Sequence, residues 1–478
     1  MTSDDGARVA DAPVARGLAW RRMHPVTPAV KGWKVLAVLL VIAFQFAGEN
    51  VRQLGDLLGG RTWLVVLGII VGGALIGFGY AAIAWRMTRF AIDDDAVYLH
   101  SGVLFRQQRK ARLDRLQAVD VVQPLLARIL GLSELKLEVA GGAGSAVSLA
   151  FLREDEAIAL RAELLARAAG APWVEGATAA PKVPEQYVLE VPPARLVAGM
   201  ARSAASVVLV LGLAGLITAV AVSGEFSTIV VMIPAVLGFV GVFWNRFSRG
   251  FNFKARISPE GIGLRHGFTE ERTQTVPPGR VQAISLAQGL LWRGPGWWRV
   301  EINVAGYASA EGQSTENVLL PIGDRDQALV AIWLVLPDLG VADPRALLAA
   351  AMDGSGREDD GFTTMPRRAH WLDPLGWRRT GYVVTDRALL IRSGRLTRRL
   401  VIIPHERTQS LALAQGPVQR RLKVASLVVH STPGPVTPRV PHLDERVAGE
   451  LMTEQAARAR TARAGAGPEL WMRPRDDA

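Results

Sequence analysis

Apolar residues follow two different patterns along the chain. Four long apolar runs begin near residues 33, 63, 203 and 226. They approach the length of about 20 residues with which a helix crosses a bilayer. Shorter segments between and after these runs alternate apolar and polar positions, which is typical of half-buried strands. The patterning therefore predicts a multi-pass membrane protein with soluble, β-rich parts.

The four apolar runs pair into two predicted transmembrane hairpins, at residues 31–88 and 199–247. The run from 63 to 85 contains no charge, and tryptophans stand at both of its ends, where headgroups would lie. Arginines and lysines flank the hairpins, whereas the two turns carry few of them. Loops rich in Lys and Arg tend to remain on the cytoplasmic side of the membrane. Both termini and all soluble segments are therefore expected to be cytoplasmic, at the cell membrane.

One polar pattern recurs three times in the same ungapped register. It consists of a glycine, an arginine 13 positions later, glutamines two and eight positions after that arginine, and a second arginine five positions further. The three copies are Gly102, Arg115, Gln117, Gln123 and Arg128; Gly267, Arg280, Gln282, Gln288 and Arg293; and Gly394, Arg407, Gln409, Gln415 and Arg420. This agreement predicts three copies of one domain.

Each copy has the local pattern of a small β domain. Strand-like alternation is interrupted at the glycine, as in a β-hairpin, and an Ala- and Leu-rich stretch closes the copy as a helix. We expect three barrels or sandwiches, each closed by an α-helix. The predicted division is a tail at 1–30, a hairpin at 31–88, domain 1 at 89–170, a linker at 171–198, a hairpin at 199–247, domain 2 at 248–338, a linker at 339–369, domain 3 at 370–465 and a tail at 466–478.

The hairpin glycine, the R-x-Q triplet and the downstream Gln-x(4)-Arg together resemble the bacterial pleckstrin-homology-like (PH-like) family of membrane proteins. Multi-repeat members of this family are known as YdbT-like, and the resemblance covers roughly residues 20–465. It implies a PH-like barrel for each repeat. For some members it also implies a link with envelope stress or resistance to antimicrobial compounds, which is an analogy at the level of fold.

Motifs for catalysis are missing from the sequence. There is no cysteine, the seven histidines are scattered, and no phosphate-binding loop or nucleophile elbow is present. Asp93, Asp94 and Asp95 alternate between the faces of a strand, so a solvated turn is favoured over a cation site. We expect no enzyme activity, no cofactor and no metal.

The repeated polar residues have two interpretations. Arg115, Arg280 and Arg407 either brace a turn by donating to carbonyl groups, which is favoured because copies that otherwise diverge keep them, or form a headgroup or peptide site. Two basic clusters follow the hairpin glycines, and each is either a lipid or partner contact or a solvated face. They consist of Arg106, Arg109, Lys110 and Arg112, and of Arg395, Arg398 and Arg399.

The net charge of +11 indicates an anionic partner. Because the basic residues flank the apolar runs, anionic lipid is favoured over nucleic acid, which is not expected as a partner. The sequence predicts a non-enzymatic membrane scaffold whose domains bind one another, a second PH-like membrane protein or the inner leaflet. The alternative is a transport or export component, although the apolar runs contain essentially no charge to line a pathway.

Overall fold

The computed structural model describes residues 20–25, 27, 62–93, 95–102, 106–139, 147–168, 187–224, 227–258, 261–276, 278–305, 317–356 and 361–465. The predicted tail at 466–478, most of the tail at 1–30, the apolar run that begins at 33 and most of the linker at 171–198 lie outside these residues. The chain forms two compact units. The first comprises Met1–Leu116, Leu126–Val139 and Ser145–Val174, and the second comprises the remainder.

The first unit holds most of the first repeat. Its antiparallel sheet has the order β1 (Arg21–Arg22), β2 (Arg89–Ile92), β3 (Ala96–Ser101) and β4 (Gln107–Arg112). Strands β6 (Leu132–Val139) and β7 (Val147–Arg153) form a hairpin. Helix α4 (Glu154–Ala168) packs on this hairpin and on the 3-10 turn η1 (Leu113–Arg115). Three acidic residues in its first turn favour that helix start.

The second unit holds the second and third repeats, which have the same element order. The second contains β8 (Tyr187–Val191), β9 (Phe253–Ser258), β10 (Gly261–His266), β11 (Glu270–Val276), η2 (Pro278–Arg280), β12 (Val281–Gln288), β13 (Trp298–Val304), β14 (Val318–Gly323) and α8 (Arg325–Val335). The third contains β15 (Thr363–Thr364), β16 (Gly381–Val384), β17 (Ala388–Ser393), β18 (Arg398–Pro404), η6 (His405–Arg407), β19 (Ser410–Ala414), β20 (Val424–His430), β21 (Arg439–Asp444) and α11 (Glu445–Gly465).

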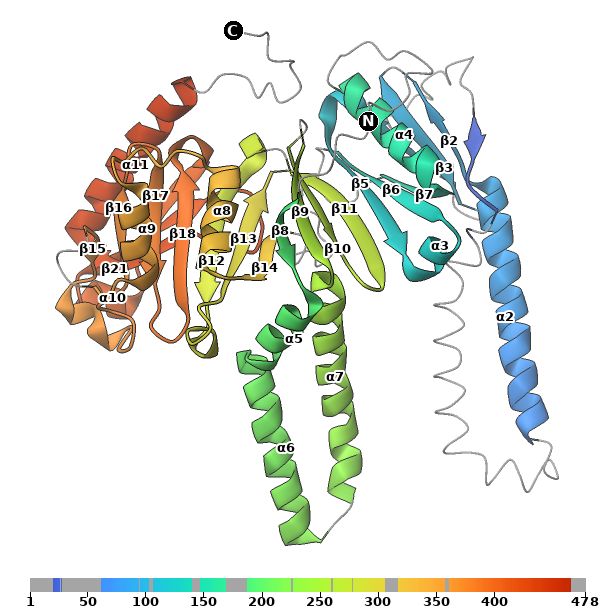
Figure 1. The fold of residues 1–478 in the computed structure, drawn as a ribbon, viewed down its shortest axis with the longest axis horizontal. Helices are drawn as coiled ribbons and strands as arrows, with labels where there is room; N and C mark the ends of the chain where they lie inside the picture. The colour runs from blue at the N-terminus through green and yellow to red at the C-terminus, as the bar shows by residue number, and fades with distance from the viewer. Residues whose placement is uncertain are drawn as a thin grey trace, which may run out of the picture. The chain divides into compact units, whose positions relative to one another are not determined.

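Each of these repeats is a sandwich of a four-stranded and a three-stranded sheet (Figure 1). The hairpin glycine turns the second strand of the larger sheet into the third, and φ is +123° at Gly267 and +73° at Gly394. An added Cβ would meet the carbonyl oxygen three residues later at both positions. Only glycine satisfies this turn without strain. The closing helix packs on the 3-10 turn in each case, α8 on η2 and α11 on η6.

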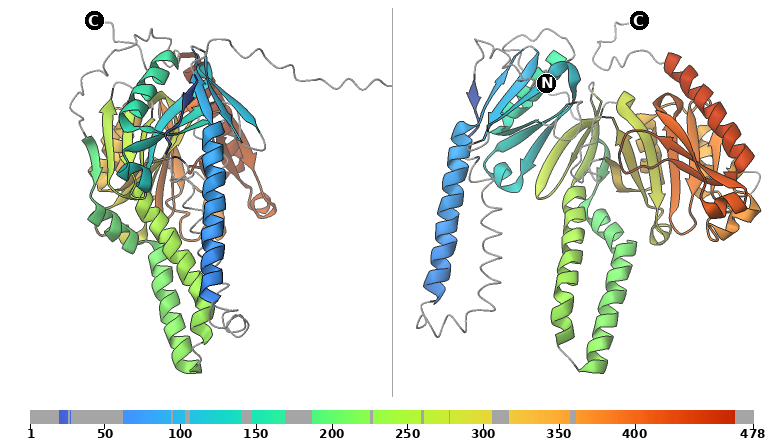
Figure 2. Two further views of the ribbon diagram at one scale, coloured as in Figure 1. Left: turned by 90° about the vertical axis from the view of Figure 1, so that its right-hand side faces the viewer. Right: turned by 180° about the vertical axis from the view of Figure 1, so that it is seen from behind.

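Two long helices extend from the second repeat. A short helix, α5 (Pro193–Ala201), leads into α6 (Ala204–Ser223), which turns at Gly224 into α7 (Ser227–Gly250). Helices α6 and α7 contact each other and run side by side in both views of Figure 2. Helix α5 is held to the repeat because Trp292 Nε1 donates to the carbonyl of Gly199 at 2.9 Å and because Leu196 is buried.

The predicted linker at residues 339–369 contains a packed helix instead. Helix α9 (Pro344–Asp353) begins at Asp343, whose side chain accepts a hydrogen bond from the amide of Ala346. Leu348 and Met352 are fully buried in the same hydrophobic core as the second repeat. This segment therefore joins the second and third repeats into one folded body.

The expected fold class is wrong in its membrane part. The described residues form four sheets, and only one helix among them, at Ala204–Val222, is long and apolar enough to cross a membrane. Helix α2 (Thr62–Met87) contains a shorter apolar segment, Val71–Met87. The last turns of α7 belong to the soluble core, where Phe247 packs and Ser248 is buried.

Candidate interface: the strand junctions between repeats

Neighbouring repeats are joined by pairing between their sheets. Strand β5 (Leu116–Pro124), which follows the first R-x-Q arginine, pairs antiparallel with β11 of the second repeat inside the second unit. Strand β12, which follows the second R-x-Q arginine, pairs in the same way with β18 of the third repeat. The second junction creates a seven-stranded sheet with the order β14-β13-β12-β18-β17-β16-β15 (Figure 1).

Both junctions use the same register when positions are counted from the hairpin glycines. Gln123 lies 21 residues after Gly102 and faces Glu271, which lies four residues after Gly267. Gln288 lies 21 residues after Gly267 and faces Arg398, four residues after Gly394. For every pair of facing residues in both junctions, the two distances in sequence from the hairpin glycine of each residue's own repeat add up to 25. A shared register indicates one mode of association used twice.

The first junction contains a buried ion pair. Arg272 Nη2 lies 2.6 Å from Asp120 Oδ2, and the exposed fractions of the two side chains are 6% and 0%. Removing both charges from water is costly, so such a pair persists only with close geometry. Because Asp120 belongs to the first repeat and Arg272 to the second, the pair fixes how β5 lies against β11.

The second junction is held by two signature residues. Gln288 donates through Nε2 to the carbonyl of Trp297 at 3.3 Å, within its own repeat, and its Oε1 accepts from Arg398 Nη1 at 3.3 Å. Arg293 donates through Nη2 to the carbonyls of Arg395 and Leu396, in the hairpin of the third repeat. Burial and the positive charges of Arg398 and Arg395 lower the pKa of Arg293.

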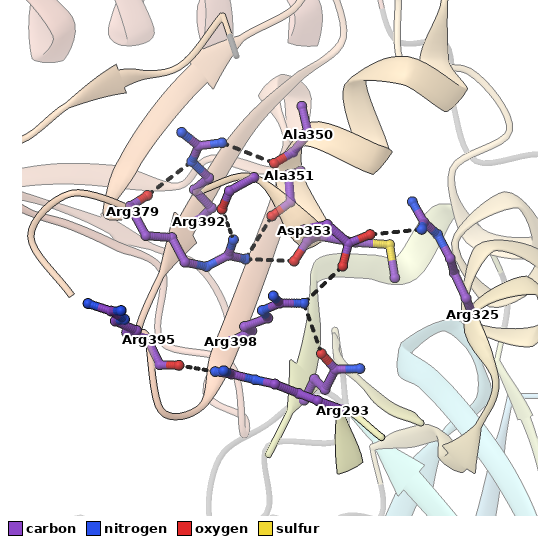
Figure 3. A network of polar contacts seen from close by, with 12 residues as sticks. Arg293, Arg325, Ala350, Ala351, Asp353, Arg379, Arg392, Arg395 and Arg398 are labelled. Atoms are coloured by element: carbon purple, nitrogen blue, oxygen red, sulfur yellow. Dashed lines mark hydrogen bonds and ion pairs between the residues drawn. The ribbon is translucent and has the colours of Figure 1, made fainter. Parts of the chain in front are cut away.

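Several further arginines surround this junction (Figure 3). Asp353, the last residue of α9, forms ion pairs with Arg398 at 2.9 Å and with Arg325 at 2.8 Å. Arg379 donates to the carbonyls of Ala351 and Met352, each at 2.9 Å. Since the last carbonyls of a helix lack partners within it, Arg379 caps α9.

Two of these guanidinium groups are buried. Burial and the charges of Arg398 and Arg392 lower the pKa of Arg379 to about 10. Arg392 is fully buried, donates to the carbonyls of Arg379 and Ala350 at 3.0 Å each, and stacks its guanidinium 4.1 Å from the ring centre of Phe362. Through these contacts both groups hold the end of α9 against the third repeat.

The other signature residues keep positions within their repeats. Arg115, Arg280 and Arg407 each end a 3-10 turn, η1, η2 or η6. Gln282 donates to the carbonyl of Arg280 at 3.2 Å. Gln117 lies in β5, and Gln409 lies between η6 and β19, directly before Ser410. Turn bracing by the three arginines remains a prediction, as does a ligand site at these positions.

The two basic clusters differ in their contacts. Arg106, Arg109, Lys110 and Arg112 lie on or beside β4, all exposed. Arg112 is ion-paired with Asp114 at 2.8 Å, and Lys110 lies 5.1 Å from the ring centre of Tyr98. In the other cluster Arg398 is used by the junction, whereas Arg395 and Arg399 are exposed. Contact of either cluster with lipid remains a prediction.

The sequence did not reveal that the second signature arginine acts between repeats. Arg293 reaches a hairpin more than a hundred residues away in sequence. The available signal was an arginine kept in all three copies, which the structure places in or directly after the short helical turn that follows the strand.

Comparison with known proteins identifies the family. The model of the bacterial PH domain matches three times, at residues 36–168, 204–333 and 340–459, which together make up most of the chain. No curated protein and no solved structure matches it. The three matches coincide with the three copies of the glycine–arginine–glutamine pattern and confirm the resemblance found in the sequence. The chain therefore belongs to the bacterial PH domain family and contains three PH repeats.

Proposed function

We propose that this protein is a non-enzymatic scaffold, attached to the cell membrane, whose PH repeats assemble proteins. The family consists of modules that typically bind proteins or lipids and lack catalysis. No group of histidine, aspartate and glutamate residues that could hold a metal occurs in the part of the chain that the structure describes. The repeats are joined edge to edge, which is a mode of protein–protein association.

The observation that carries membrane attachment is the exposure of α6. Leu211 is 66% exposed and Ile217 70% exposed, in a helix segment without any charged residue. Such a surface is unfavourable in water, because apolar area costs roughly 25 cal/mol per Å² exposed. We infer that lipid covers α6, with α7 beside it. The hydroxyl of Thr218 donates to the carbonyl of Ala214 at 2.9 Å, so it needs no partner in lipid.

Arginines flank this helix pair on the side of the repeats. Arg195 and Arg202 precede α6, and Arg246 follows the apolar part of α7. This distribution favours a cytoplasmic position for the PH repeats. Transport is less well supported, because α6 carries no charged side chain that would line a pathway.

The test of membrane attachment replaces two exposed apolar residues of α6. We expect the native chain to float with membranes and to resist alkaline extraction. The double variant Leu211→Arg, Ile217→Arg should be released, because each central arginine costs at least about 2.5–3.5 kcal/mol in a bilayer. Thr453→Arg with Thr461→Arg, on exposed positions of α11, is the matched control and should remain bound.

The test of the scaffold activity uses the same membranes. We expect chemical crosslinking followed by affinity capture to recover this chain crosslinked to a protein partner in stoichiometric amount. Recovery of the chain with anionic lipid alone, from membranes to which it remains attached, would contradict assembly and would favour a lipid-binding surface on the basic clusters instead.

A further inference from the structure

Among the edge strands of the described sheets, two have counterparts that are paired in the internal junctions. Strand β4 ends the sheet β1-β2-β3-β4, and β19 ends the sheet β19-β20-β21. By repeat position, β4 corresponds to β11 and β18, and β19 corresponds to β5 and β12. The array of repeats therefore ends with one half of a junction at each end, and the two halves are complementary.

The exposure of these edges matches an unused junction. Strand β12, which is paired on both sides, is buried at seven of its eight residues. In β19 no residue is fully buried, and Leu413 is 42% exposed. In β4 only Ala111 is buried. Edges with free backbone donors and acceptors are templates for pairing with another strand.

The third repeat also carries the side chains that the second repeat uses at its junction. Gln415 Nε2 donates to the carbonyl of Val424 at 3.2 Å, just as Gln288 donates to Trp297. In the described structure Gln415 Oε1 accepts no hydrogen bond, whereas the same atom of Gln288 accepts from Arg398. Arg420, the counterpart of Arg293, is exposed, and its guanidinium makes no hydrogen bond or ion pair with described residues.

The complementary half lies on the first repeat. The residue four positions after Gly102 is Arg106, the counterpart of Arg398, and it is exposed. Gln415 opposite Arg106 would therefore repeat the amide–guanidinium pair of the second junction with the same residue types. A partner of unrelated sequence would need to supply this arginine at the same distance from a hairpin turn.

We propose that β19 of one copy of this chain pairs antiparallel with β4 of a second copy, in the register of the internal junctions. The two distances in sequence from the hairpin glycines again add up to 25, which places Gln415 opposite Arg106, Ala414 opposite Gln107 and Leu413 opposite Gln108. This inference rests on the proposed assembly function and names its partner. The contact is heterologous, so it generates rings or open chains of copies. Membrane attachment favours it by raising the effective concentration.

Disulfide trapping tests the register, because the chain contains no cysteine. Two differently tagged full-length chains, Ala414→Cys and Gln107→Cys, are produced together in membranes and oxidised. We expect a disulfide-linked dimer carrying both tags. Opposed residues of antiparallel strands bring their Cβ atoms within about 4.5–5.5 Å, close enough for a disulfide after a small adjustment. The control pair Ala414→Cys with Arg109→Cys is shifted by two residues and should link at least ten times less.

An internal pair calibrates the chemistry. Ala287 and Arg399 hold the same repeat positions as Ala414 and Gln107 and face each other within one chain. The chain with Ala287→Cys and Arg399→Cys should therefore close its disulfide under the same conditions. If it closes and the mixed chains do not link, or if they link equally in the shifted register, pairing between copies is overturned.

A charge exchange tests the predicted side-chain contact independently. Gln415→Arg would face Arg106 of the second copy and should reduce the yield of mixed dimer at least fivefold. Arg106→Glu in the second chain should restore it. If linking fails while the membrane-attached chain still captures another protein in stoichiometric amount, the second copy is excluded and the scaffold function stands. If no protein is captured either, both the pairing between copies and the scaffold function are contradicted.

Discussion

Arg398 of the third repeat donates a hydrogen bond to Gln288 of the second across 3.3 Å, at the end of the strand pair that joins the two repeats. Gln288 also donates to Trp297 within its own repeat. One buried amide thus links the strand order inside a PH repeat to the attachment of the next repeat. Because Gln288 belongs to the threefold pattern, the pattern includes a residue that joins two repeats as well as residues that stabilise each repeat.

Replacing Gln288 by alanine should destabilise the second unit by about 2–3 kcal/mol, since two hydrogen bonds of about 0.5–1.5 kcal/mol each are lost and a buried site is emptied. Gln415→Ala is the matched variant and, at concentrations at which the chain is monomeric, should cost about 1 kcal/mol, because only the bond to Val424 is then lost. Urea unfolding in detergent, followed by tryptophan fluorescence, measures both. Equal losses would contradict the role of the second junction.

Breaking the buried ion pair of the first junction should have a larger effect. Asp120→Leu leaves the guanidinium of Arg272 buried without this carboxylate, and the expected loss is about 3–5 kcal/mol. The double variant Asp120→Leu, Arg272→Met should recover most of the loss, because no charge is then buried. Glu450→Ala, which breaks the exposed pair with Arg446, should cost less than about 1 kcal/mol. A double variant as unstable as the single one would refute this account.

Removing one buried polar group should stabilise the protein. Gln274 in β11 is fully buried, and neither its Oε1 nor its Nε2 has a hydrogen-bond partner among described residues. An unsatisfied buried amide costs about 1–3 kcal/mol. Gln274→Met keeps the length of the side chain and should raise the free energy of unfolding by about 1 kcal/mol, measured by the same urea titration. A loss of stability would show that the amide has a partner in solution.

Acid should destabilise the second unit partly through His266. Burial and the charge of Arg272 lower the pKa of His266 to about 4, whereas the unfolded value is about 6.5. The unfolded chain therefore binds the proton first, so this contribution to stability is intact above about pH 6.5 and is lost as the pH falls towards 4. His266→Gln should flatten the decrease between pH 6.5 and 4.5, and His430→Gln, at an exposed position, should not.

The local parts of the fold could be predicted from the sequence, and the long-range parts could not. The hairpins at Gly267 and Gly394 depend on alternation and on one residue type with positive φ, which are visible within a few positions. Helix α9 was also readable, because Asp343 followed by Pro344 is a helix-start signal, but the surrounding Asp, Gly and Arg residues favoured a linker.

The register of the junctions depends on contacts between residues far apart in the chain. No local pattern pairs Gln288 with Arg398 or Asp120 with Arg272. The membrane helices were over-predicted for a related reason. An apolar run such as residues 226–244 is compatible with lipid or with a protein core, and the end of α7 packs on the second repeat through Phe243 and Phe247.

The central claim is that copies of this chain join by the same strand pairing that joins its own repeats. The most direct measurement is the mass distribution of the full chain in detergent over a range of concentrations. The account predicts a head-to-tail series that grows with concentration, or one closed ring, and in either case a shift to monomer in Gln415→Arg. A chain that remains monomeric at all concentrations, or a dimer that never grows and is unaffected by Gln415→Arg, would contradict it.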